Sequence, residues 1–477
     1  MPLPEADRRE LGLLAPALLA GALVWTTTGP YGPGLSPDSV QFLAAAKSLA
    51  AGLGWRRVEG GPLVEWAPLL PAWLALGIKL GVSPFLWARA TGAVAAAGVS
   101  WALGAWTSRA SGSWLAGYGA ALVTAVSFPL LFVSAHLWSD TPFLFLALLG
   151  VLALDDDRWH AAAAFAALAC LTRYLGVTIV AAGALWLASR RRWREALLYA
   201  LLSVAPLALW LARNAFLSGT ATGHREPPGF TPTANLSAFV HSAVDPLIPL
   251  PWPGPIKLVL VVFLALFGWL ALARRRPGPL TLFVAFYSLA VVIVSSIWGS
   301  DPLDVRLALP LSVALVAGGF VAAAHAPGRP ARVALAILAL FWFTRALVRD
   351  TASIALYRHD GVPGFTDRHW RASATLARLR AAPPSHTTYS NAPEIAWLAL
   401  ERPVRLTPRA HLVYDTGSRV NDLDAFVAAL GRDSPATLVW FREADRPALV
   451  ARDTLARHVS LRPMAELSDG AIDEASP

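Results

Sequence analysis

The sequence predicts a mainly α-helical membrane fold of about 11–13 transmembrane helices, followed by a small C-terminal α/β domain. Apolar runs of about 16–24 residues fill the first 348 positions, and a helix needs roughly 20 apolar residues to cross the hydrocarbon core. The chain is 56% hydrophobic and only 15% charged, whereas a soluble protein carries about 25% charged residues. From residue 350 onward the charge density rises. We therefore expect a membrane domain over 1–349 and a soluble domain over 350–477.

The net charge of +9 does not indicate a nucleic-acid partner, because much of the positive excess stands in short clusters between apolar runs. Such clusters are typical of cytoplasmic loops in membrane proteins. Cys170 is the only cysteine, so no internal disulfide can form. The clusters comprise Arg190, Arg191, Arg192 and Arg194, then Arg274, Arg275 and Arg276, and finally Arg329 and Arg332.

The first apolar run, 11–28, follows Arg8 and Arg9 and resembles a signal peptide. It is long, however, and no clear small-residue cleavage site follows it, so we expect a retained first helix. The candidate spans are 11–28, 67–81, 85–107, 113–133, 137–154, 159–172, 174–189, 195–217, 255–273, 279–298, 306–324 and 331–348.

The basic clusters predict which loops lie inside the cell. They place 190–194 inside and the segments 29–66 and 218–254 outside, with the C-terminal domain also outside. Alternate counting from the N-terminus conflicts with this, since it places 190–194 outside. One span between 67 and 175 must therefore be split, re-entrant or miscounted. The step Ser127-Phe128-Pro129 is one candidate break, because proline interrupts helical hydrogen bonding.

Two external segments are too long to be simple turns. In 29–66, Ser36-Pro37-Asp38-Ser39 is a helix start with a serine cap and proline in the first turn. Apolar residues then repeat at helical spacing until Gly52 and Gly54, which predicts a short helix on the membrane surface. The segment 218–254 is rich in proline and glycine and predicts an ordered loop or lid.

The tail alternates between strand and helix patterns, which favours a small α/β domain. We expect strands at 387–390, 404–406 and 437–441, and helices at 394–400, 423–430 and 453–458.

Two acidic residues are candidates for chemistry. Asp38 stands at a helix start beside the membrane, where it either complements the helix dipole, worth roughly 0.3–1 kcal/mol, or acts on a substrate. Asp140 stands at the edge of an apolar run, where a charge costs about 2.5–3.5 kcal/mol. It should therefore face a cavity or a partner, unless it simply starts a helix before Pro142.

Arginines form a second group of candidates. Arg173, Arg213 and Arg306 lie at span ends that we place outside, and Arg225 lies in the second external segment. External arginines are less expected than internal ones, and the guanidinium group matches phosphate geometry. The alternative is that these side chains snorkel to the interface.

Four further features have two interpretations each. Glu65 either supports a base or a metal ion, or is a solvated loop carboxylate. Trp55 and Trp66 either line a substrate site or belong to interfacial belts. His136 is either a proton relay or metal ligand, or an interfacial side chain. The run 155–157 of three aspartates favours a solvated loop over a metal site.

Several of these motifs occur in the same order in a known group of proteins. The stretch from Pro37-Asp38-Ser39-Val40 through Lys47 to Gly52-Leu53-Gly54-Trp55 resembles the first external loop of GT-C glycosyltransferases. The nearest group is the family 39-like one, with protein mannosyltransferases and the bacterial aminoarabinose transferase. The paired-proline segment 62–71, Arg213-Asn214 before a glycine, and Asp304-Val305-Arg306 before a proline are also similar. Ser39 departs from the tandem-acid form of the loop.

The resemblance covers roughly 29–310 and implies a GT-C fold and an inverting sugar transfer at the outer face of a bacterial inner membrane. The donor would be a polyprenyl-phosphate sugar, and the acceptor a lipid, glycan or protein. A divalent metal ion occurs in some members of the group. The resemblance implies Asp38 as catalytic base, and relatives have an acidic residue in a place similar to that of Asp140. We expect Asp140 and Glu65 to support the base. We also expect Arg173, Arg213, Arg225 and Arg306 at the lipid phosphate, with Trp55, Trp66 and His136 as candidate sugar or acceptor contacts.

Two other functions remain open from the sequence. A transporter or flippase would also explain the spans and the charged residues among them, but it predicts pseudo-repeated halves, and we find no internal repeat. A non-catalytic scaffold that displays the tail is the third possibility. Substitution of Asp38 distinguishes the enzyme from both.

Overall fold

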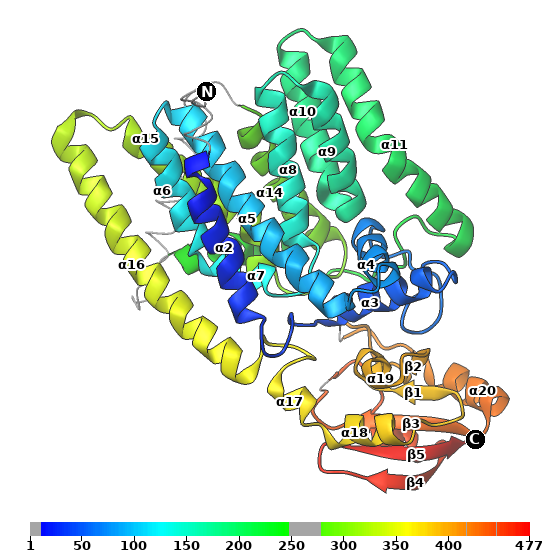
Figure 1. Ribbon diagram of the computed structural model, residues 1–477. Helices are drawn as coiled ribbons and strands as arrows, with labels where there is room; N and C mark the ends of the chain where they lie inside the picture. Colours follow the sequence, from blue (N-terminus) through cyan, green and yellow to red (C-terminus); the bar gives the residue numbers. More distant parts are fainter. Residues whose placement is uncertain (1–10, 248–277, 416, 445) are drawn as a thin grey trace.

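The computed structural model describes residues 11–247, 278–415, 417–444 and 446–477. A helical bundle forms the larger part, and a sheet-containing C-terminal part lies at one end of it (Figure 1). The predicted fold class is confirmed. The expected span 255–273 and the cluster at 274–276 lie outside the described residues.

The bundle is built from helices with mixed lengths. Four described helices are long and apolar enough to cross a membrane, namely α11, α14, α15 and α16, or five if the bent pair α6 and α7 is one span. The helices are α2 (Leu14–Thr27), α5 (Pro84–Ser111), α6 (Trp114–Ala125), α7 (Phe128–Ser134), α8 (Asp140–Asp155), α9 (Trp159–Thr172), α10 (Val177–Ser189), α11 (Trp193–Ser218), α12 (Pro232–Val244), α14 (Pro279–Ile297), α15 (Val305–Ala324) and α16 (Gly328–Asp360), with short 3-10 turns η1 (Tyr174–Gly176) and η2 (Asp245–Leu247).

Small residues let the helices approach closely. A Cβ atom on Gly117 of α6 would lie 2.6 Å from the carbonyl oxygen of Gly104 on α5, so the two backbones nearly touch. Close packing of this kind is typical of membrane helices, which gain little hydrophobic energy from association. Larger apolar side chains, among them Leu103 and Leu148, are buried in the same core.

The break predicted near Ser127 is present. Helix α6 ends at Ala125, α7 begins at Phe128, and their axes differ by 53°. Pro129 stands in the first turn of α7, where its missing N–H costs nothing. Because α8 starts near the C-terminal part and runs away from it, we count the bent pair as one crossing (Figure 1).

The expectation that 67–81 crosses the membrane is wrong. Helix α4 (Leu69–Lys79) has 11 residues, a length of about 16 Å, roughly half of the hydrocarbon core. It lies beside α3 at the end of the bundle that faces the C-terminal part (Figure 1). When 67–81 is not counted as a crossing, the loops 155–158 and 190–194 both lie at the end of the bundle away from the C-terminal part. This agrees with the inside location that the arginines of 190–194 predict.

Helix α3 (Pro37–Ala50) forms as its sequence predicts. The Ser36 hydroxyl accepts a hydrogen bond from the Ser39 N–H (3.4 Å), and the Ser36 N–H donates to the Ser39 hydroxyl (3.1 Å). This capping box satisfies two N–H groups at the helix start. Ser39 therefore has a structural role at the position where the tandem acid is expected. After the helix, Gly52 and Gly54 both have φ +79°, a conformation that favours glycine.

The C-terminal sheet has the strand order β2-β1-β3-β5-β4. Strand β1 is parallel to β2 and β3, whereas β5 is antiparallel to β3 and β4. The expected strands and helices are present, but the hairpin of β4 and β5 was not predicted. The elements are α17 (Arg368–Arg371), α18 (Ala374–Ala381), β1 (Thr388–Ser390), α19 (Pro393–Leu400), β2 (Val404–Leu406), α20 (Leu423–Asp433), β3 (Ala436–Phe441), α21 (Arg452–Leu455), β4 (Ser460–Glu466) and β5 (Gly470–Ser476).

One apolar core joins the C-terminal part to the bundle. Buried side chains of α3 and α4, such as Phe42 and Leu74, pack in the same cluster as Ile395 of α19 and Phe441 of β3. Helices α3 and α4 therefore form a platform between the two parts, and the first turn of α3 is fixed from both sides.

Candidate functional site

Two carboxylate–guanidinium pairs meet at the start of α3. Asp38 Oδ2 of α3 lies 3.0 Å from Arg306 Nη1 of α15. Asp140 Oδ1, at the start of α8, lies 2.5 Å from Arg173 Nη1. The charges of Asp38 and Arg306 also act on Asp140, so the four groups form one cluster. The side chain of Asp38 is 35% exposed and that of Asp140 only 5%, so Asp38 is the carboxylate that a substrate can reach.

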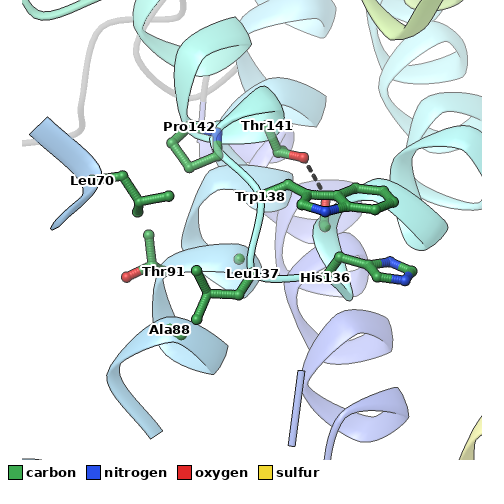
Figure 2. A pocket seen from close by; sticks show the side chains of 10 residues that line it. Leu70, Ala88, Thr91, His136, Leu137, Trp138, Thr141 and Pro142 are labelled. Carbon is green, nitrogen blue, oxygen red and sulfur yellow. Dashed lines mark hydrogen bonds between the residues drawn. The ribbon is translucent and has the colours of Figure 1, made fainter. Parts of the chain in front are cut away.

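A stack of rings holds this cluster in place. The Trp138 indole N–H donates to the Ser36 hydroxyl (2.8 Å), and the Arg306 guanidinium lies 5.1 Å from the Trp138 ring centroid. The His136 ring stacks on the Trp138 ring, with the two centroids 4.0 Å apart. Figure 2 shows both rings on the side opposite Leu70, and both residues are among those that line a small cavity of about 10 Å³. The stack therefore ties the α3 cap to α15.

Both ring nitrogens of His136 face carbonyl oxygens. Nδ1 lies 2.7 Å from the Phe132 oxygen and Nε2 lies 3.0 Å from the Pro363 oxygen. Burial lowers the pKa of His136 to about 4, although the two carbonyl oxygens act in the opposite direction. A neutral ring can donate to only one of them. The His136 ring therefore hydrogen-bonds to one of these carbonyl oxygens, while its other nitrogen faces the second carbonyl oxygen and not an open site.

A second group of predicted residues surrounds the loop 55–66. Arg57 Nη1 lies 2.7 Å from Glu65 Oε1. Arg225 donates to the Glu65 carbonyl oxygen (3.3 Å), and Arg213 donates to the Leu63 carbonyl oxygen (2.6 Å). Because Arg213 and Arg225 have carbonyl partners here and not carboxylates, their positive charges are not neutralised by these contacts.

Aromatic residues fix the same loop. Tyr174 directly follows Arg173 in the sequence. Its hydroxyl lies 2.9 Å from the Val64 carbonyl oxygen and 3.0 Å from the Trp66 carbonyl oxygen. Trp55 packs edge-on against Trp210 at 5.2 Å. Trp66 packs edge-on against Phe42 at 6.3 Å. Both predicted tryptophans therefore have packing partners within the protein.

The C-terminal part contributes a loop to the site. The Glu226 carboxylate accepts hydrogen bonds from the N–H groups of Val413 (2.7 Å) and Tyr414 (3.2 Å) and lies 3.0 Å from Arg409 Nη1. The Tyr414 ring packs against Gly299, where a Cβ atom would lie 2.3 Å from it. We call this contact the Glu226 latch.

The latch brings two further groups near Asp38. Burial raises the pKa of Tyr414 to about 12, and the charges of Asp301, Asp38 and Glu226 act in the same direction. Burial also raises the pKa of Asp301, whereas Arg306 opposes that shift. Arg225 acts on Tyr414 as well, so Tyr414 lies close to members of both groups.

The structure thus pairs Asp38 with Arg306 and Asp140 with Arg173, close enough for the charges of one pair to act on the other. It places Glu65, Arg213 and Arg225 around the adjoining loop. Sequence analysis did not select Trp138, Asp301 or Tyr414. Trp138 stands between the selected residues His136 and Asp140, and Asp301 stands shortly before Asp304-Val305-Arg306, but nothing local marks Tyr414.

The other metal candidates have ion-pair partners. Asp156 lies 2.7 Å from Arg109, and Asp157 pairs with Arg192. Among the residues that the structure describes, no group of three or more His, Cys, Asp or Glu side chains is placed to hold a metal ion.

The arrangement of the helices defines a known class of fold, that of the GT-C glycosyltransferases, and the predicted resemblance is confirmed at the level of the fold. No protein-family model matches the chain, and no curated protein sequence matches it.

Three solved structures carry this comparison. ArnT from Cupriavidus metallidurans, an aminoarabinose transferase in the apo state, has a TM-score of 0.60 and 16% identity over 95% of this chain and 96% of its own. The same protein bound to undecaprenyl phosphate has a TM-score of 0.59 and 14% identity over the same shares. The arabinofuranosyltransferase AftD from Mycobacteria has a TM-score of 0.51 and 15% identity over 97% of this chain and 40% of its own. The chain is a multi-pass membrane protein with this fold.

Proposed function

We propose that this chain is a membrane glycosyltransferase that moves a sugar from a polyprenyl-phosphate donor to an acceptor, with inversion at the anomeric carbon. The observation that carries the proposal is the reachable Asp38 carboxylate beside Arg306, with the buried Asp140–Arg173 pair behind them. The fold it shares with ArnT, which has been solved with undecaprenyl phosphate bound, supports the choice of donor.

In the proposed reaction, Asp38 accepts a proton from the nucleophilic group of the acceptor. That group attacks the anomeric carbon from the face opposite the leaving group and forms the new glycosidic bond. The bond between the anomeric carbon and the phosphate oxygen breaks, and the electron pair leaves with the phosphate. Cationic groups that stabilise this developing charge lower the barrier.

Arg306 has two roles in this proposal. In the empty site it pairs with Asp38 at 3.0 Å, and its ring contact with Trp138 limits where it can move. A donor phosphate competes with Asp38 for the same guanidinium group. When the phosphate takes over Arg306, the Asp38 carboxylate is free to accept the proton of the acceptor.

Arg213 and Arg225 would hold the remaining phosphate oxygens. Their present partners are backbone carbonyl oxygens, so an anion can add to them without displacing a carboxylate. Arg57 is less suited, because Glu65 already neutralises it. Glu65 would then position the loop through Arg57. Arg173 would keep Asp140 charged and oriented behind Asp38.

The acceptor would enter beside the C-terminal part. Tyr414 lies near Asp38 and Asp301, and the Glu226 latch fixes its backbone. This geometry supports Tyr414 as a contact on the acceptor side. The site lies at the bundle end opposite the basic loop 190–194, which supports an external, extracytoplasmic location in a bacterial inner membrane.

The deciding experiment measures sugar transfer by the purified chain in nanodiscs with a panel of polyprenyl-phosphate sugars. D38N should lower turnover by about 10²–10⁴-fold and keep donor binding. The matched control is D453N, because Asp453 is also an exposed acid in the first turn of a helix and lies far along the chain in α21. Equal turnover in D38N and the control would remove Asp38 from the mechanism. No turnover with any donor, together with saturable lipid or solute movement in proteoliposomes, would favour the transporter.

A further inference from the structure

A second cavity, of about 480 Å³, lies between the bundle and the C-terminal part. The extended segment 33–36 separates it from the site. One edge of that segment bonds to the loop before α8, with the Gly34 N–H donating to the Ala135 oxygen (3.0 Å). The other edge bonds to the chain after α16, with the Phe365 N–H donating to the Leu35 oxygen (2.9 Å). The cavity lies on the side of Phe365.

Three arginines line this cavity, and none of its described lining residues is acidic. Arg89 donates to the Trp25 carbonyl oxygen (2.6 Å) and stacks on the Trp25 ring at 3.7 Å. Arg371 donates to the carbonyl oxygens of Tyr31 (2.7 Å) and Thr366 (3.2 Å). These partners satisfy donors but carry no negative charge.

Arg380 is the most available of the three. It is exposed on α18, and within the described part of the chain it has no ion pair and no hydrogen bond. Three guanidinium groups around one cavity without a carboxylate create a positive potential that attracts anions. Guanidinium groups also match the geometry of phosphate oxygens.

Beside the hydroxyl residues Thr28, Ser83 and Thr366, apolar side chains form part of the cavity lining. Phe85 and Leu86 come from the start of α5, and Leu398 comes from α19. Leu86 is 46% exposed, and α2 and α5 also present Leu18 and Val94 outward. These apolar side chains belong to bundle helices, so they give the cavity a boundary with the acyl chains of the membrane. A free inorganic anion would leave this surface unused.

We propose that this cavity binds the phosphate headgroup of an anionic membrane lipid. Arg380 and Arg371 contact the phosphate from the C-terminal part, and Arg89 contacts it from α5. The acyl chains lie along Phe85 and Leu86. The lipid is distinct from the sugar donor, because Asp38 and Arg306 lie on the other side of the segment 33–36. The inference does not depend on the proposed sugar transfer.

Native mass spectrometry of the purified chain in detergent tests this proposal by titration with phosphatidylglycerol and phosphatidylcholine. We expect phosphatidylglycerol to bind about tenfold more tightly, because both lipids carry the phosphate but the three arginines repel the positive choline group of phosphatidylcholine. R380E should remove the preference for phosphatidylglycerol, and R380K should restore it. R378A is the matched control, because Arg378 is exposed on the same helix and does not line the cavity. D38N should bind the lipid as the wild type does.

Three results would overturn the proposal. They are equal binding of both lipids to the wild type, equal binding of phosphatidylglycerol to R380E and to R378A, and displacement of the bound lipid by millimolar inorganic phosphate. The last result would assign the cavity to a free anion. Unchanged melting temperatures for R380E and R378A would ensure that the comparison concerns binding alone.

Discussion

Two arginine-rich regions lie on either side of the segment 33–36, and they differ in what their arginines face. In the candidate active site, Arg306 and Arg173 each face a carboxylate, Asp38 and Asp140. In the second cavity, Arg89 and Arg371 face carbonyl oxygens and rings. Paired charges are suited to moving a proton and exchanging partners during a reaction. Unpaired charges are suited to holding an anion, which is the role proposed for Arg213 and Arg225 beside the first region and for the three arginines of the second cavity.

The largest expected effect is a loss of sugar transfer on substitution in the candidate active site but not in the second cavity. D38N should lower sugar transfer by about 10²–10⁴-fold, the usual contribution of general base catalysis. R380E in the other region should leave transfer unchanged at saturating donor. Initial rates of both variants at equal folded yield check this. A loss of similar size in R380E would mean that the two regions act as one.

The Asp140–Arg173 pair should separate stability from catalysis. D140N leaves the buried Arg173 charge without its partner, and breaking such a pair costs about 3–5 kcal/mol. The double variant D140L/R173M should regain most of the melting temperature but not the transfer activity. Thermal unfolding followed by tryptophan fluorescence, alongside turnover, gives both readouts. If the double variant were fully active, the pair would serve packing only.

The Glu226 latch should affect the acceptor and not the donor. E226A removes the acceptor of two backbone N–H groups, so Tyr414 loses its fixed position. We expect the KM for the acceptor to rise about tenfold, as for the loss of one charged hydrogen bond. The KM for the donor should stay the same. Y414F separates the hydroxyl from the ring, and an equal rise for both substrates in E226A would indicate general unfolding of the loop.

The smallest effect concerns pH. The pKa of His136 is about 4 in the folded protein and is near 6.5 when unfolded, so the unfolded chain binds the extra proton first. His136 therefore contributes stability that is complete above about pH 6.5 and is lost as the pH falls toward 4, by at most roughly 1.4 kcal/mol per unit. Melting temperatures of wild type and H136N between pH 4 and 8 test this. A parallel decline in both would contradict it.

Local motifs made part of the fold predictable. The serine cap, Pro37 and the paired glycines predicted α3, and its capping box is present. Apolar composition alone misled at α4, because a run can be apolar enough to cross and too short to do so. The β4–β5 hairpin was missed because β4 is mostly exposed and carries Pro463 on an edge strand, which weakens the usual strand pattern.

The site was predictable only where its residues belong to a motif. Asp38 and Arg306 stood out as charges beside apolar runs, and the structure pairs them. Tyr414 and Arg380 come from the C-terminal part, where tyrosine and exposed arginine are ordinary. Their proximity to the bundle depends on the docking of the sheet through α3 and α19, which no short stretch of sequence encodes.

The geometry of α16 has a consequence for engineering. Its 33 residues run from the far end of the bundle to the C-terminal part without a break, as an arm about 50 Å long. Each inserted residue would advance that arm by about 1.5 Å and turn whatever follows by about 100° around its axis. One extra alanine near Asp360 would swing the Tyr414 loop away from Glu226. Seven would return it almost to its original bearing, displaced by about 10 Å. The number of residues in α16 therefore sets the direction in which the chain leaves the helix.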